Sequence, residues 1–414
     1  MAYHVPAVPP GIADDPQAQA AYLLEDGFSA APEDALVDKL RRGEPLRVKF
    51  GVDPTAPAVT WGWSVPLRRL RRFQELGHTA VLVIGDFTAQ VGDPSGRSAT
   101  RVRLSAEQVH TYVQSCMASL LEVLSPDNLE VRRNSEWLNS LGMAGALELT
   151  AQATVAQLLE RNDFSKRFDA NEPISLIEFI YPLLQGQDSV AINADVELGG
   201  TDQYFNCMLA RTLQQRAGQR PQAVVSAPLL VGIDGKKKMS QSIGNYIGVA
   251  EHPKEIFGKV MSLPDEAMPA YVRLALDLRP GDKDTMLAES GGVVLKRRLA
   301  REMIAMFHSG EAAADAEAEF DRIFVRRDVP SEMTHHTTTE NYVPRILVDL
   351  GFASSLSDAR RGIKGGGVRV DGEAVAEEHA TLGEGTWVLQ LGRRRFARVT
   401  VAQGPGKVAG TPVT

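Results

Sequence analysis

The order of apolar and polar positions predicts alternating strands and helices in the first half of the chain. Short apolar runs at 46–52 and 79–85 predict two buried strands. Between them, apolar residues three and four positions apart predict a helix over 63–76 that buries one face. Strand, helix and strand with short links are typical of a right-handed parallel unit, so we expect a Rossmann-like, doubly wound α/β sheet.

The same kind of pattern continues along the chain. Ser105 with Gln108, and Ser175 with Glu178, have the spacing of a capping box and predict two helix starts. Further strands are expected at 129–132, 189–193 and 222–227, and a helix at 202–218. From 253 to 324 the pattern is helical. The last section predicts two short helices followed by a few strands, which is a small α+β module.

These changes of pattern divide the chain into domains. A polar stretch at 326–341 separates the helical region from the last module. We therefore predict a catalytic α/β domain at 1–246, an α-helical domain at 247–330, a linker at 331–340, a small module at 341–404 and a disordered tail at 405–414.

Composition excludes several classes of protein. Of the 414 residues, 43% are hydrophobic and 23% are charged, which is ordinary globular usage and excludes extended disorder. The two cysteines, Cys116 and Cys207, cannot build a disulfide framework, and no spacing points to a metal site. With no apolar run long enough to cross a bilayer and no signal-peptide pattern, we expect a cytoplasmic protein with no membrane partner.

Charge is unevenly distributed along the chain. The net charge is −7, which argues against a generally basic nucleic-acid binder. From 341 to 414, however, ten basic residues face seven acidic ones. A basic module on an acidic body suggests a polyanionic partner for that module.

One candidate site is the sequence YPLLQGQD at 181–188. Tyr181, Gln185 and Asp188 are spaced to share one helical face. A phenol, an amide and a carboxylate there can bind a small polar ligand. The alternative is a plain solvated face.

Three glycine-containing segments are further candidates. The loop at 85–98 follows a predicted strand, where doubly wound sheets bind ligands, but it could equally be a surface turn. The glycine pair at 199–200 can present backbone N–H groups to an anion or a ribose, and Asp202 can bind a ligand or cap the next helix. The lysines at 236–238 form either a clamp on phosphates or a solvated charge run.

Taken together and in this order, these segments resemble tyrosyl-tRNA synthetases of class I, over about residues 20–402. The motifs are GVDPTAP, GDFTAQVGDPSGRS, YPLLQGQD, DVELGGTDQ and the loop containing KMS. The resemblance implies a Rossmann-like catalytic domain, a helical anticodon-binding domain and an RNA-binding module like one found in a ribosomal protein. It also implies a homodimer that binds tyrosine or a related amino acid and tRNA.

The resemblance assigns roles to particular residues. Asp93 would hold the substrate ammonium, Asp188 would accept the phenol hydroxyl, and Gln187 stands where the family often has tyrosine. The full amino-acid set is Thr88, Asp93, Tyr181, Gln185, Asp188 and Gln203. The catalytic candidates are Asp53, Thr55 and Lys238. The RNA-binding candidates are Arg360, Arg361, Lys364 and Arg369.

The nucleotide signatures depart from the family. Its His-x-Gly-His motif aligns with Thr60-Trp61-Gly62-Trp63, and no histidine occurs from 5 to 77. Its Lys-Met-Ser-Lys-Ser motif is KMSQS here, with Gln241 for the second lysine, and Lys236 and Lys237 lie on the wrong side of the motif to replace it simply. Trp61 is expected in the core. The remnants of the nucleotide site are Gly51, Thr60, Gly62, Trp63, Gly200, Asp202, Met239, Ser240 and Gln241.

Each lost donor would cost about 2.7–4 kcal/mol in an adenylation transition state. The sequence therefore favours a protein that binds tyrosine or an analogue, with ATP-dependent adenylation impaired or lost and the fold repurposed, for example for aminoacyl transfer. One alternative is a working tyrosine-tRNA ligase, which needs ATP with magnesium. A second is a non-catalytic regulator that binds RNA or an amino acid.

Overall fold

The computed structural model describes residues 3, 7–95, 104–289, 291–326, 329–330, 333–392 and 395–402. The predicted tail at 405–414 and the end of the glycine-rich motif at 96–98 lie outside these residues. The chain forms two compact units, Met1–Ala314 and Asp315–Thr414.

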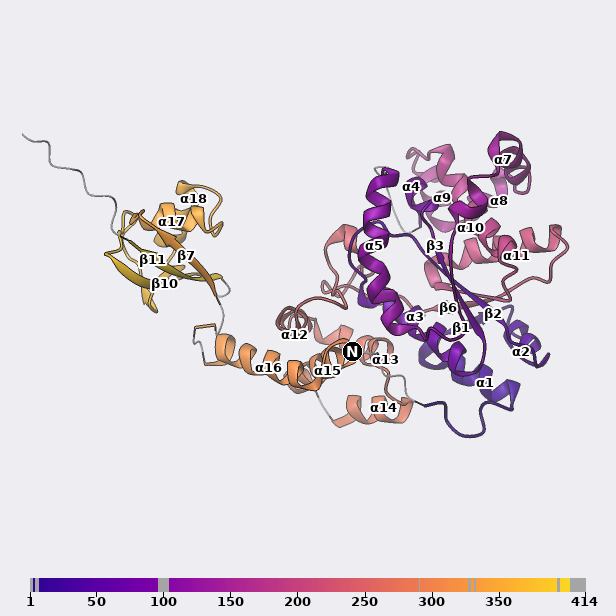
Figure 1. Cartoon of the computed structure of the whole chain (residues 1–414), viewed down its shortest axis with the longest axis horizontal. Coiled ribbons are helices and arrows are strands. Elements are labelled where there is room, and N and C mark those ends of the chain that lie inside the picture. The colour runs from indigo at the N-terminus through magenta and orange to yellow at the C-terminus, as the bar shows by residue number, and fades with distance from the viewer. Residues whose placement is uncertain are drawn as a thin grey trace, which may run out of the picture. The chain divides into compact units, whose positions relative to one another are not determined.

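The first unit contains a six-stranded sheet with the order β1-β6-β5-β2-β3-β4 (Figure 1). All neighbouring pairs are parallel except β1 with β6. The strands are β1 (Ser29–Ala31), β2 (Arg47–Val52), β3 (Thr79–Ile84), β4 (Leu129–Arg133), β5 (Val196–Gly200) and β6 (Ala223–Ala227). The strands predicted at 46–52, 79–85, 129–132 and 222–227 are thus confirmed.

The strand order reverses in the middle of this sheet. The chain passes from β2 to β3 and β4 in one direction, and then returns to β5 and β6 on the other side of β2. In such sheets, ligands bind beyond the carboxyl ends of the strands where the order reverses. The doubly wound architecture is confirmed. The strand order reverses between β2 and β5, so the expected ligand site lies beyond the carboxyl ends of these two strands.

Helices cover both faces of the sheet. In Figure 1, α3 and α5 lie on one side of β2 and β3, and α10 and α11 lie on the other. Both capping boxes predicted from the sequence are present, at Ser105 and at Ser175. The helices before β6 are α1 (Pro16–Leu23), α2 (Ala35–Leu40), α3 (Trp61–Glu75), α4 (Thr88–Val91), α5 (Ala106–Val123), α6 (Ser135–Leu138), α7 (Gly142–Thr150), α8 (Val155–Leu159), α9 (Asn162–Asp169), α10 (Leu176–Ala191) and α11 (Tyr204–Arg216).

The strand predicted at 189–193 is wrong. These residues continue α10 to Ala191, and Asn193 takes a positive φ of 51° before the chain enters β5. The apolar run there is short, and periodicity alone cannot separate a short buried strand from the end of a buried helix. The correction matters because it keeps Asp188 inside the helix.

The helical region after the sheet packs in the same compact unit. It contains α12 (Pro253–Met261), α13 (Met268–Ala275), α14 (Pro280–Glu289) and α15 (Gly292–Phe307), and α16 (Gly310–Phe320) crosses the boundary between units. Trp61 on α3 is fully buried, and its ring meets Phe307 edge to face with centroids 5.0 Å apart. Trp61 is therefore a core residue, as predicted. The compact unit ends within the helical domain predicted at 247–330.

The second unit is a small α+β module. Its sheet has the order β7-β11-β10-β8-β9, and α17 (Val343–Asp349) and α18 (Leu356–Lys364) pack on a core that includes Ile346, Leu389 and Val399. The strands are β7 (Thr334–Thr338), β8 (Val368–Val370), β9 (Glu373–Ala374), β10 (Gly385–Leu391) and β11 (Arg395–Val401). Strand β7 lies in the predicted linker and pairs with β11 in parallel. The linker prediction is therefore wrong for these residues, because a polar THHTT run gives no apolar signal for an edge strand.

Across the described residues, no helix is both long and apolar enough to span a membrane.

Candidate active site

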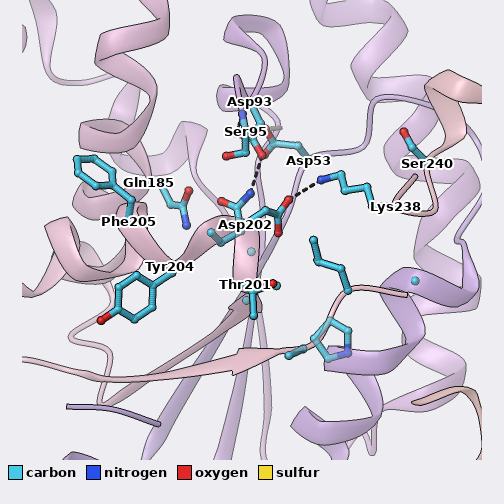
Figure 2. Close-up of a pocket in the computed structure, with 18 of the residues that line it drawn as sticks. Asp53, Asp93, Ser95, Gln185, Thr201, Asp202, Tyr204, Phe205, Lys238 and Ser240 are labelled. Carbon is cyan, nitrogen blue, oxygen red and sulfur yellow. Dashed lines mark hydrogen bonds and ion pairs between the residues drawn. The ribbon is translucent and has the colours of Figure 1, made fainter. Parts of the chain in front are cut away.

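A cavity of about 1480 Å³ lies at the carboxyl ends of β2 and β5. The side chains that line it come from several elements, and Figure 2 shows Asp53, Asp93, Gln185 and Asp202 around one pocket. Every residue predicted for catalysis, amino-acid binding or nucleotide binding lines this cavity. They are Gly51, Asp53, Thr55, Thr60, Gly62, Trp63, Thr88, Asp93, Tyr181, Gln185, Asp188, Gly200, Asp202, Gln203, Lys238, Met239, Ser240 and Gln241.

Asp53 follows β2 and joins two neighbouring elements. One of its carboxylate oxygens accepts a hydrogen bond from Thr88 Oγ1 at 2.8 Å, and the other accepts one from the Tyr181 hydroxyl at 2.9 Å. Burial raises the pKa of Tyr181 well above its usual range, and the nearby carboxylate of Asp53 adds to the effect. Tyr181 is therefore a neutral donor held in one orientation.

Asp188 is buried on α10, and its carboxylate accepts hydrogen bonds from two side chains. Trp137 Nε1 donates to one oxygen at 2.8 Å, and Asn134 Nδ2 donates to the other at 3.3 Å. Burial raises the pKa of Asp188 to about 6, although the charge of Lys49 and both donors favour the ionised form. A buried carboxylate held by fixed donors can accept a hydrogen bond from a ligand hydroxyl.

Two glutamines, Gln185 and Gln203, line the part of the cavity that the sequence resemblance assigns to the amino acid. Asn206 Nδ2 donates to Gln185 Oε1 at 2.9 Å and to Gln203 Oε1 at 3.1 Å. Gln203 Nε2 in turn donates to Asp93 Oδ2 at 2.8 Å. The chain of bonds orients an acidic and an amide group toward the same space, where a ligand ammonium and carboxylate would find partners. Gln187 is not among the lining residues, so the departure at that position falls outside the cavity.

A buried ion pair between Lys49 and Glu197 also lines the cavity, and sequence reasoning missed it. Lys49 Nζ donates to Glu197 Oε1 at 2.8 Å, to Ser189 Oγ at 2.8 Å and to the carbonyl oxygen of Gln185 at 2.9 Å. Burial is the largest single influence and opposes the charge of Lys49, but attraction to Glu197 and Asp188 together with the hydrogen bond to Glu197 outweighs it, so the pKa of Lys49 is raised. The pair ties β2 and β5 to α10 in the wall of the cavity, which both residues line.

The start of α3 and the KMS loop form the part of the cavity wall that the sequence resemblance assigns to the nucleotide. Thr60 caps α3, and its hydroxyl accepts the amide N–H of Trp63 at 3.3 Å. Met239 packs on Gly62, whose N–H donates to the sulfur at 3.2 Å. Gln241 donates through its side chain to the carbonyl oxygen of Ala58. The loop is thus fastened to the segment that starts α3.

Lys238 and Asp202 form an ion pair in this end of the cavity. Asp202 lies in the short 3₁₀ turn Thr201–Gln203, and its side chain makes no cap for α11. Of the two roles open for Asp202 from the sequence, the cap is therefore wrong. The pair puts one acceptor and one cation where a nucleotide would meet them.

Two family models match the chain. The model for class I tRNA synthetases of the W and Y type matches residues 41–325, and the S4 domain model matches residues 343–388. Curated relatives 46–47% identical over 89% of the chain bear the name tyrosine--tRNA ligase, so the chain belongs to the tyrosyl-tRNA synthetase family. The S4 match covers α17 and α18, and on the latter Arg361 and Lys364 are highly exposed.

Relatives in this family match over most of their length. The chain is 47% identical to "Tyrosine--tRNA ligase" of Moorella thermoacetica, over 89% of this chain and 92% of that protein. It is 46% identical to "Tyrosine--tRNA ligase 2" of Vibrio parahaemolyticus, over 89% of this chain and 95% of that protein.

Solved structures share the fold at low identity. The mitochondrial tyrosyl-tRNA synthetase of Aspergillus nidulans aligns with a TM-score of 0.60 at 19% identity, over 75% of this chain and 98% of that one. The tyrosyl-tRNA synthetase of Archaeoglobus fulgidus, solved with L-tyrosine, aligns with a TM-score of 0.58 at 19% identity, over 73% and 99% of the two chains.

The other predicted RNA-binding residues lie in the second unit with local partners. Arg360 Nε donates to the Tyr342 hydroxyl at 3.1 Å, and Arg369 donates to the carbonyl oxygen of Gly372 at 2.8 Å. Lys364 Nζ lies 3.8 Å from Glu378 Oε1, a long contact. Arg361 and Lys364 therefore remain the better exposed cations of this set.

Proposed function

We propose that this chain is a tyrosine-tRNA ligase, which activates L-tyrosine with ATP and transfers it to tRNA. The observation that carries the proposal is the buried Asp188, held by Trp137 and Asn134 at one end of a cavity that also presents Asp93 and Gln203. The near full-length match to relatives that bear this name supports it over the impaired form that the sequence alone favours.

The amino-acid end selects tyrosine through its hydroxyl. Asp188 accepts the substrate hydroxyl, while Asp93 and Tyr181 face the ammonium. A pocket built to bond a hydroxyl rejects the analogue that lacks it by about 10⁴–10⁵, because its buried polar group is left unpaired. Phenylalanine would leave Asp188 without that partner, so the pocket discriminates against it.

The nucleotide end binds ATP as the activating substrate. Lys238 supplies positive charge toward the phosphates, and Asp202 accepts from the ribose after its ion pair with Lys238 opens. Among the described residues, no group of three His, Cys, Asp or Glu side chains could hold a metal. Magnesium would therefore enter with the nucleotide phosphates rather than reside on the protein.

The module that matches the S4 model would bind tRNA. Arg360, Arg361, Lys364 and Arg369 are its candidate contacts. Phosphate contacts from such cations make RNA affinity fall with salt. The excess of basic residues from 341 to 414 supports this role.

A homodimer is part of the proposal. Large apolar side chains on consecutive helices of the first unit are exposed, including Met143 at 77%, Phe168 at 64% and Leu176 at 80%. Where exposed apolar side chains form one large contiguous patch, they mark an interaction surface in soluble proteins. A second copy of the chain, as the family resemblance implies, would cover them.

A second candidate function retains tyrosine binding but lacks adenylation, with the fold repurposed. Three observations favour it: Thr60 is engaged as a helix cap, Trp63 lines the nucleotide end, and Gln241 donates to a backbone carbonyl. None of these side chains offers a cation to a pentacovalent phosphate. Catalysis of this step depends on such positioned charge.

Tyrosine-dependent exchange of labelled pyrophosphate into ATP separates the two candidates. A ligase exchanges label and charges tRNA, and phenylalanine does not replace tyrosine. No exchange together with tight tyrosine binding would overturn the ligase and support the second candidate. The triple variant T60H/W63H/Q241K, which restores the family signatures, should then raise exchange by roughly 10² or more.

A further inference from the structure

The loop between β6 and α12 has a fixed turn. Asp234 Oδ1 accepts the amide N–H groups of Lys236 at 2.9 Å and Lys237 at 3.0 Å, and Asp234 Oδ2 accepts Asn245 Nδ2 at 2.8 Å. The Gly232 N–H donates to the carbonyl oxygen of Lys237 at 2.8 Å. The backbone at residue 237 is therefore held from both sides.

Gly235 makes this turn sharp. Its φ is +67°, and an added Cβ would lie 2.2 Å from Pro264 Cγ. A positive φ and close packing together require glycine there. The turn thus fixes the backbone from which the side chains of Lys236 and Lys237 extend.

The two lysines before the KMS motif differ in location. Both side chains are exposed, but Lys237 lines the active-site cavity and Lys236 does not. From the sequence, both lie on the wrong side of the motif to replace the cation missing at Gln241. In the structure, residues 237 and 241 both line the cavity, which makes Lys237 a candidate for that role.

The other groups of the motif are already engaged. Lys238 pairs with Asp202, and the amide of Gln241 donates to the carbonyl oxygen of Ala58. The side chain of Lys237 makes no hydrogen bond or ion pair with another described residue, although, beside the hydrogen bond from the Lys236 amide, its charge helps to lower the pKa of the nearby Asp234 carboxyl. Its charge is therefore available to a ligand in the cavity.

We propose that Lys237 contacts the β- and γ-phosphates of ATP and supplies the positive charge that Gln241 does not carry. The inference rests on the proposed ligase function. In the reaction, a tyrosine carboxylate oxygen forms a bond to the α-phosphorus. The bond from that phosphorus to the bridging oxygen breaks, and pyrophosphate leaves with the electron pair. Lys237 stays protonated and stabilises the charge that develops on the leaving group.

Lys166 is another exposed cation that lines the cavity. It lies on α9, which begins next to Arg161, and Arg161 donates to Asn206 at 3.2 Å. Asn206 binds both glutamines of the amino-acid end. Lys166 therefore lies on the helix that follows this network, whereas Lys237 directly precedes the KMS motif.

The test compares Lys237→Ala with Lys236→Ala, a matched loss of one exposed charge from the neighbouring residue. Calorimetry measures the affinity for inorganic pyrophosphate and for tyrosine, and the exchange assay measures turnover. We expect K237A to weaken pyrophosphate binding and to lower exchange by roughly tenfold to a hundredfold. K236A should stay close to the unchanged protein, and tyrosine affinity should stay the same in both variants.

A rescue variant adds a second readout. Gln241→Lys in the K237A background should recover most of the lost exchange, because it returns a cation to the same cavity. Equal effects of K237A and K236A, or no binding of pyrophosphate by the unchanged protein, would overturn the inference.

If the unchanged protein binds pyrophosphate but shows no exchange, the ligase proposal fails. A selective loss of pyrophosphate binding in K237A would then still support the role of Lys237.

Discussion

Replacing Gly85 with alanine tests whether Asp53, Thr88 and Tyr181 act as one unit. Gly85 directly follows β3, and an added Cβ would lie 1.9 Å from Asp53 Oδ1 and 2.4 Å from Thr88 Oγ1. Ordinary contacts of a Cβ begin near 3.4 Å. Both side chains must therefore move by about 1 Å or more, a displacement large enough to break a hydrogen bond.

The magnitude follows from the bonds that this movement breaks. Asp53 accepts from Thr88 at 2.8 Å and from Tyr181 at 2.9 Å. A hydrogen bond to a charged group contributes about 1.5–3 kcal/mol, so losing one or both lowers the free energy of unfolding by about 2–5 kcal/mol. Tyr181 also loses its fixed orientation, and the dissociation constant for tyrosine should rise by at least about tenfold.

Urea unfolding and calorimetry with tyrosine check this expectation. Gly258→Ala is the matched control, because Gly258 lies in α12 and an added Cβ there meets nothing within 4 Å. G258A should bind tyrosine normally and unfold at the same or a slightly higher urea concentration. The reasoning is refuted if G85A matches G258A in both measurements.

Three further predictions concern buried charges. Burial raises the pKa of Asp188 to about 6, so lowering the pH from 7 to 5 protonates the carboxylate that accepts the tyrosine hydroxyl, and the KM for tyrosine should rise. A pH profile of KM checks this, and the rise should be absent in the D188N variant. Burial lowers the pKa of His78 to about 4, below about 6.5 in the unfolded chain. The unfolded state then binds more protons in this window, and urea titrations should show stability falling by about 3 kcal/mol from pH 6.5 to 4, with a flatter slope in H78N. Lys49→Met leaves Glu197 buried without its cation and should cost about 3–5 kcal/mol in urea unfolding, and an unchanged midpoint would contradict this.

Most of the fold follows from local signals. The helix predicted at 63–76 and the capping boxes at Ser105 and Ser175 depend on residues within one or two turns, and the structure confirms them. The two wrong predictions concern segments whose sequence pattern does not determine their secondary structure. The apolar run predicted as a strand at 189–193 starts within the last turn of α10, which ends at Ala191. The polar strand β7 is stabilised by pairing with β11, a partner about 60 residues away in the sequence.

The site divides in the same way. Residues within one motif, such as Tyr181 and Asp188, could be grouped from their spacing. The residues that hydrogen-bond Asp188 could not be predicted in this way, because Trp137 and Asn134 follow another strand, β4. The ion pair of Lys49 with Glu197 could not be predicted either, because it joins two strands of the sheet that are far apart in the sequence. A lysine in the middle of a predicted buried strand was the available signal, since buried lysines require a partner.

The departures at the nucleotide end have a consequence for stability as well as for chemistry. Thr60 provides a side-chain cap for α3, which contributes about 0.5–2 kcal/mol relative to a residue that cannot cap. Gln241 fastens the KMS loop to the backbone before α3. These residues stabilise the folded chain at the place where the family signatures put catalytic donors. Restoring those donors should therefore raise exchange and lower the unfolding midpoint together, whereas a change in exchange alone would show that the departures carry no gain in stability.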